Sequence, residues 1–164
     1  MRTVLVCDNE PFIRSGLKDM VNELGFDRVL ECANGRLAVA VALSERPDLI
    51  LLDASLPKKG GLSAARMIRR KMDTPILLLA EEFDARMVQG AKKSLISAML
   101  TKPVRGQDLG PAIAMAFARA ERVNAIRREL HRLREEAEKE ESSDETPSVP
   151  MQAGHVAAAT IAVP

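Results

Sequence analysis

The sequence predicts an α/β fold: a doubly wound, five-stranded parallel sheet with an extended C-terminal helix. Short apolar runs alternate with segments whose apolar residues recur at helical spacing, from the start of the chain to about residue 120. This alternation is typical of sheets in which each strand is followed by a helix. Hydrophobic residues make up 46% of the 164 residues, which is enough for a core and excludes a wholly disordered chain.

The predicted strands are short and mostly apolar, and turn-forming or charged residues bound them. They are Thr3–Cys7, Arg28–Cys32, Leu49–Leu52, Ile76–Ala80 and Ala98–Thr101. The third strand is apolar throughout, as expected in a parallel sheet that is covered on both faces.

A helix is predicted after each strand. The first begins at Pro11, which suits a first helical position because its missing N–H needs no partner there, and it ends at Gly25. Its apolar residues fall on one face, namely Ile13, Leu17, Met20, Val21 and Leu24. The later helices are expected over Leu37–Leu43, after Gly60-Gly61, over about Asp84–Lys93, and from about Asp108 onwards.

Charged residues stand where several predicted strands end. Asp8 follows the first strand, Asp53 the third and Lys102 the fifth. In doubly wound sheets, ligands bind at the carboxyl ends of the strands. Two carboxylates and one ammonium group at that edge suit a cation together with a phosphoryl group.

Four motifs with these residues occur in a characteristic order and spacing. They are Val-Cys-Asp8-Asn9-Glu10-Pro11, Pro47-Asp48-Leu-Ile-Leu-Leu-Asp53-Ala-Ser-Leu-Pro57, Pro75-Ile-Leu-Leu-Leu-Ala80 and Thr101-Lys102-Pro103. Over about residues 1–120, the chain resembles the receiver domain of two-component response regulators. The resemblance implies a flavodoxin-like receiver fold and a role in phosphorelay signal transduction, not an enzyme that turns over a metabolite.

The resemblance also implies roles for individual residues. Asp53 matches the aspartate that takes a phosphoryl group from a histidine kinase or a phosphotransfer protein. Asp8 and Asn9 match the pair that holds Mg²⁺ beside it, and Ser55 matches the residue that gives a backbone carbonyl ligand. Lys102 matches the lysine that pairs with the phosphoryl oxygens, and the proline after it indicates a cis peptide bond.

Three positions depart from the family pattern. Asn9 replaces an aspartate, so the Mg²⁺ site is expected to be weakened. Ala80 replaces a Thr or Ser that bonds the phosphoryl group, and Met99 replaces the aromatic residue that moves inward after phosphorylation. Two interpretations therefore stay open: a receiver phosphorylated on Asp53 that acts through protein contacts, or a phosphorylation-independent pseudo-receiver that serves as a dimeric interaction module.

The last helix is predicted to extend beyond the receiver as residues 121–141. Its apolar residues recur at steps of 3, 4, 3 and 4, which indicates a coiled-coil seam and a homodimer, in parallel or antiparallel orientation. The seam residues are Val123, Ile126, Leu130, Leu133 and Ala137. This plan resembles regulators of the antiterminator (ANTAR) class, in which an RNA-binding module follows. Residues 142–164 are too short for that module and are expected to be a disordered tail.

Composition excludes several other classes of function. The net charge is +1 and aromatic residues make up 2% of the chain, so base-stacking platforms are missing and we do not expect nucleic-acid binding. The last helix has a basic stretch over residues 119–134, which is interpreted as a solvated face balanced by the acidic stretch over residues 135–145. No signal peptide or membrane span is predicted. Cys7 and Cys32 are expected to be buried free thiols in a reducing cytoplasm.

Overall fold

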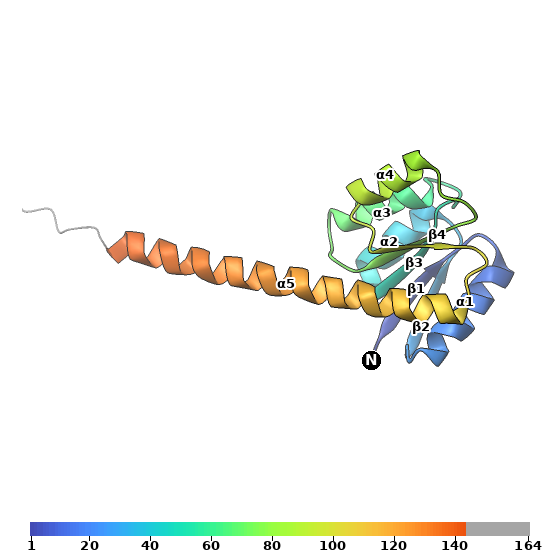
Figure 1. The fold of residues 1–164 in the computed structure, drawn as a ribbon, viewed down its shortest axis with the longest axis horizontal. Coiled ribbons are helices and arrows are strands. Elements are labelled where there is room, and N and C mark those ends of the chain that lie inside the picture. The colour runs from blue at the N-terminus through green and yellow to red at the C-terminus, as the bar shows by residue number, and fades with distance from the viewer. Residues whose placement is uncertain (144–164) are drawn as a thin grey trace, which may run out of the picture. The chain divides into compact units, whose positions relative to one another are not determined.

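Strands and helices alternate in the computed structural model, which describes residues 1–143, with side chains through residue 139 (Figure 1). Within these residues, the five strands are β1 (Thr3–Cys7), β2 (Arg28–Cys32), β3 (Leu49–Asp53), β4 (Ile76–Ala80) and β5 (Ala98–Thr101). All five predicted strands are confirmed. β3 is longer than predicted because Asp53 is itself the last strand residue, in register with Leu79 of β4.

The helices of the described chain are α1 (Pro11–Glu23), α2 (Gly35–Glu45), α3 (Gly61–Arg69), α4 (Ala85–Lys93) and α5 (Gly106–Ser143). Side-chain caps explain two of their starting points. Asn34 accepts a hydrogen bond from the Leu37 amide at 2.9 Å, and Asp84 accepts one from the Met87 amide at 2.6 Å. The Asn34 cap is the reason that α2 begins at Gly35, earlier than the apolar pattern predicts.

The sheet is parallel throughout and has the strand order β2-β1-β3-β4-β5. This topology confirms the predicted doubly wound fold. β3 and β4 are buried along their whole length, as their apolar sequences predict. β2 lies at one edge of the sheet, where it pairs with β1 alone among the described strands.

Two clusters of hydrophobic side chains pack the helices against the sheet. One cluster joins the sheet to α2, α3 and α4, and it contains Cys7 and Cys32. The other joins the sheet to α1 and to the first turns of α5, through residues such as Leu17 and Ile113. Asp8, Asp53 and Lys102 stand at or just after the carboxyl ends of β1, β3 and β5, outside both clusters, and the candidate site is built from them.

Helix α5 runs from Gly106 to Ser143, which confirms the predicted extended C-terminal helix. The chain divides into a compact unit, Met1–Ile126, and a second unit that starts at Arg127. The predicted boundary at residue 120 stays a prediction, as does the coiled coil over residues 121–141. The predicted start of the tail at residue 142 is wrong by two residues, because Ser142 and Ser143 belong to α5, and the rest of the predicted tail, residues 144–164, lies outside the described residues. None of the helices within residues 1–143 has the length and hydropathy that crossing a membrane requires.

Candidate functional site

Asp8 lies directly after β1 and is fully buried. Its amide donates a hydrogen bond to the Cys32 carbonyl at 3.1 Å, which continues the β1–β2 ladder by one residue. Its carboxylate Oδ1 accepts a hydrogen bond from the Glu10 amide at 2.9 Å. The backbone around the start of α1 therefore fixes the orientation of this carboxylate, and its other oxygen, Oδ2, accepts a hydrogen bond from Lys102.

Asp53 ends β3 and has only 1% of its surface exposed. The loop that follows returns close to it: the Gly61 amide donates to the Ala54 carbonyl at 3.0 Å. A Cβ atom on Gly61 would lie 2.0 Å from the Asp53 carbonyl oxygen, so only glycine fits there. Gly60, just before it, has a φ of +64°, in the region that favours glycine. The Gly60-Gly61 pair therefore packs the start of α3 against the backbone of Asp53.

Lys102 follows β5, and its amide donates to the Ala80 carbonyl at 2.8 Å. Its ammonium nitrogen Nζ lies 2.6 Å from Asp8 Oδ2 and 3.0 Å from Asp53 Oδ1. Burial by itself lowers the pKa of Lys102, but the hydrogen bonds to Asp8 and Asp53 outweigh it and hold the pKa above its usual value. The Lys102–Pro103 peptide bond is cis, as predicted. We call Asp8, Asp53 and Lys102 the carboxylate–lysine cluster.

The carboxylate–lysine cluster carries two negative charges and one positive charge in a buried setting. The second oxygen of Asp53, Oδ2, is buried and has no hydrogen-bond partner. Among the described residues, no three His, Cys, Asp or Glu side chains gather as a ligand group, so a cation here would rely on two carboxylates and neutral oxygens. Mg²⁺ is commonly held in this way, by one or two carboxylates with waters and phosphate oxygens completing its shell. The donor set of the cluster therefore fits Mg²⁺.

Of the other predicted site residues, three lie at the same edge of the sheet, and Met99 lies further back in β5, in register with Leu78. Asn9 and Ser55 are exposed, and each is within two residues of a cluster carboxylate in the chain. Ala80 is 2% exposed at the end of β4, in register with Thr101. Met99 is half-buried in β5 and packs against the α2–α3 side of the core. The structure thus brings Asp8, Asp53 and Lys102 into direct contact, and it places Ala80 on the strand between the last two.

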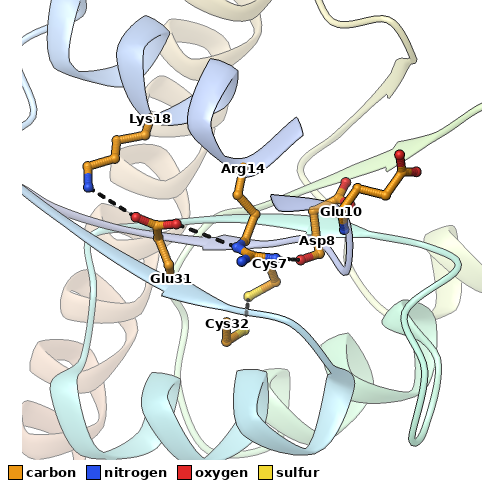
Figure 2. A network of polar contacts seen from close by, with 7 residues as sticks. All are labelled: Cys7, Asp8, Glu10, Arg14, Lys18, Glu31 and Cys32. Atoms are coloured by element: carbon orange, nitrogen blue, oxygen red, sulfur yellow. Dashed lines mark hydrogen bonds and ion pairs between the residues drawn. The ribbon is translucent and has the colours of Figure 1, made fainter. Parts of the chain in front are cut away.

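Sequence reasoning did not single out Arg14, which anchors the Asp8 backbone from α1 (Figure 2). Its Nη1 donates to the Asp8 carbonyl at 2.8 Å, and its Nε lies 3.5 Å from Glu31 Oε2 on β2. Lys18, one helical turn later, also pairs with Glu31 at 3.1 Å. The sequence signal for this contact was two basic residues four positions apart on one helix, together with a glutamate between the apolar residues of a strand.

The Cys7 and Cys32 side chains meet at the end of the same pair of strands (Figure 2). Their sulfur atoms lie 2.8 Å apart, and both residues are free, buried cysteines, as predicted. Burial raises the pKa of the Cys7 thiol well above its usual value, so this neighbour of Asp8 is a neutral group.

Comparison with known proteins gives matches along most of the chain. The family model for the response regulator receiver domain matches residues 4–114. The transcriptional regulatory protein PdtaR of Mycobacterium tuberculosis is 34% identical over 137 residues, which cover 84% of this chain and 67% of that protein. A protein-glutamate methylesterase/protein-glutamine glutaminase of Archaeoglobus fulgidus is 35% identical over 92 residues, and the matched part is only 25% of its length.

Solved structures show the same fold. The chemotaxis protein CheY4 of Vibrio cholerae superimposes with a TM-score of 0.65 at 28% identity, covering 71% of this chain and 98% of that one. The receiver domain of the sensor histidine kinase PA1611 from Pseudomonas aeruginosa gives a TM-score of 0.60 at 29% identity, covering 66% and 90%. That structure has a magnesium ion coordinated in its active-site cleft. With its family match, its relatives and its fold in agreement, this chain belongs to the response regulator receiver domain family.

Proposed function

We propose that this receiver accepts a phosphoryl group on Asp53 from a histidine kinase or a phosphotransfer protein, and then acts through protein contacts. The observation that carries the proposal is the buried cluster in which Lys102 bridges Asp8 and Asp53 and leaves Asp53 Oδ2 without a partner. One carboxylate oxygen is thereby held by the ammonium group, and the other is available to form a bond. Receiver domains of this family are generally signalling modules without a metabolic reaction of their own.

The proposed transfer forms one bond and breaks one bond. Asp53 Oδ2 attacks the phosphorus of the donor, the bond between phosphorus and the donor atom breaks, and the donor leaves with that electron pair. Mg²⁺ would be held by the carboxylates of Asp8 and Asp53, the side-chain amide oxygen of Asn9 and the backbone carbonyl of Ser55. When bound there, it supplies positive charge that lowers the repulsion between the carboxylate and the phosphoryl oxygens. Lys102 then releases its contact with Asp53 Oδ1 and pairs with the transferred phosphoryl group.

The response to phosphorylation is proposed to be small. Ala80 offers a methyl group where a hydroxyl would donate a hydrogen bond to the new phosphoryl oxygen. A hydrogen bond to a charged group is worth about 1.5–3 kcal/mol, and this chain lacks that contribution to a change of state. The Met99 side chain is flexible and can adapt to an inward or an outward position. It therefore does not separate these two positions as sharply as a rigid aromatic ring would.

We also propose that the protein is a homodimer joined through α5. The seam side chains Val123, Ile126, Leu130 and Leu133 are 38%, 61%, 50% and 48% exposed, respectively. Their heptad spacing suits a second copy of the same helix, which would bury all of them together.

A second candidate function is a pseudo-receiver whose state is set by a partner and not by phosphate. The observation that favours it is Ala80, buried at the end of β4 without a hydroxyl group, together with the neutral amide of Asn9.

Intact-mass measurement after incubation with acetyl phosphate and Mg²⁺ separates the two candidates. The proposal expects one added phosphoryl group on the wild type and on Asp19→Ala, which removes an exposed aspartate of α1, and none on Asp53→Ala. A folded wild type that gains no phosphoryl group at any Mg²⁺ concentration would instead establish the pseudo-receiver.

A further inference from the structure

We propose that Cys7 and Cys32 form a reversible oxidation site, at which a peroxide converts the two thiols into an intramolecular disulfide between β1 and β2. The proposal does not depend on phosphorylation of Asp53. It gives a chemical role to two side chains that the receiver chemistry leaves unused.

The strand register brings the two cysteines together. Cys7 and Cys32 are direct partners in the parallel pairing of β1 with β2, and both side chains belong to the cluster on the α2–α3 side of the sheet. Neighbouring strands lie about 4.7–4.9 Å apart, within the Cα separation of about 4.4–6.8 Å that a disulfide spans. The sulfur atoms are 2.8 Å apart, against about 2.05 Å in a disulfide, so bond formation requires little movement.

The surroundings set the order of the steps. Cys32 is 6% exposed at the end of the edge strand β2, whereas Cys7 is 0% exposed on the strand inside it. A peroxide molecule therefore reaches Cys32 first. Cys7 lies behind it as the resolving thiol, in contact with the sulfur that has been oxidised.

The reaction balances with one peroxide for each pair of thiols. The Cys32 sulfur attacks one oxygen of hydrogen peroxide, the O–O bond breaks, and the released hydroxide takes up the Cys32 proton as water. The Cys7 sulfur then attacks the Cys32 sulfenic sulfur, the S–S bond forms, and the S–O bond breaks. The hydroxyl group leaves with the Cys7 proton as a second water. Two electrons pass from the two thiols to the peroxide, and a dithiol reductant reverses the change.

The backbone at this position is already held in place around the two sulfurs. The amide of Asp8, the residue after Cys7, donates to the carbonyl of Cys32 at 3.1 Å. On the opposite face, Arg14 contacts the Asp8 carbonyl and pairs with Glu31, so α1 holds the ends of both strands (Figure 2). The disulfide therefore adds a covalent link between two strand ends that hydrogen bonds already hold together, and neither strand has to unfold.

The test uses the reduced full-length chain, treated with hydrogen peroxide, freed of peroxide, denatured and alkylated with N-ethylmaleimide. The proposal expects two alkylated cysteines before treatment. After treatment it expects none, with a mass lower by about 2 Da and no link between chains. Dithiothreitol should restore both alkylation sites. Cys7→Ala and Cys32→Ala should each keep one thiol and show no loss of 2 Da, by the same chemistry.

Peptide mapping of the wild type makes the result independent of how the variants fold. Tryptic digestion of the oxidised chain should yield residues 3–14 linked to residues 29–36. Two cysteines that stay alkylatable, a gain of oxygen as sulfinic acid without a link, or a disulfide between two chains would each overturn the proposal.

Discussion

Replacing Lys102 with methionine tests the electrostatics of the site, because it removes the only charge of the carboxylate–lysine cluster that opposes the two carboxylates. Nζ lies 2.6 Å from Asp8 and 3.0 Å from Asp53, and the three side chains are 12%, 0% and 2% exposed. Removing one partner from a buried ion pair typically costs about 3–5 kcal/mol, since the remaining charge is left uncompensated. We therefore expect Lys102→Met to lower the free energy of unfolding by about 3–5 kcal/mol near neutral pH.

The assay is urea unfolding followed by far-ultraviolet circular dichroism, since the chain has no Trp or Tyr to report by fluorescence. The matched control is Lys18→Met, which removes an ammonium group at a similar distance, 3.1 Å, from Glu31. That pair is 45% and 35% exposed, so its loss is expected to cost about 0–1 kcal/mol. Mg²⁺ should stabilise Lys102→Met more than the wild type, because the cation meets two carboxylates that are not already paired. Equal, small losses in the two variants would refute the assignment of Lys102 as the charge that holds this cluster.

Because the pKa of Lys102 is raised in the folded protein, the stability that the wild type gains over Lys102→Met depends on pH. This difference in the free energy of unfolding is full below the unfolded-state pKa of about 10.4 and is lost as the pH rises through the higher folded-state pKa. Urea unfolding of both proteins at alkaline pH checks this. Asn9→Asp should lower the Mg²⁺ concentration at which acetyl phosphate loads Asp53, because a carboxylate replaces a neutral amide; a mass titration with unchanged half-loading would contradict this. Leu130→Asp should convert a micromolar dimer into a monomer with the receiver still folded, as measured by light scattering, and a monomeric wild type would contradict the coiled coil. Ala80→Thr should enlarge the amide shifts over residues 80–105 when beryllofluoride is added, and a wild-type response of equal size would show that the signal passes by another route.

The strands and their parallel arrangement follow from local sequence because each strand is short and mostly apolar, and each is followed by a helix that allows a parallel crossover. Asp8 and Lys102 are 94 positions apart in the chain, yet both follow strands that end at the same edge of the sheet. Convergence of these residues was therefore predictable from topology, and the structure shows the contact.

Features that depend on three-dimensional approach were not predictable in the same way. The need for glycine at position 61 comes from the Asp53 carbonyl, which the sequence places eight positions away without indicating contact. Arg14 meets Glu31 and the Asp8 backbone only because α1 crosses the ends of β1 and β2. The contact between Cys7 and Cys32 likewise depends on the register of a strand pair, which a shift of one residue would abolish.

The most direct test of the central claim is to locate the phosphoryl group on the chain. Borohydride reduction of a phosphorylated aspartate gives homoserine, which has one oxygen fewer and two hydrogens more. After treatment with acetyl phosphate and Mg²⁺, followed by reduction and tryptic digestion, the account predicts this change in the peptide of residues 37–58, at Asp53 and not at Asp48. The change at another residue, or no change in folded protein, would contradict Asp53 as the acceptor.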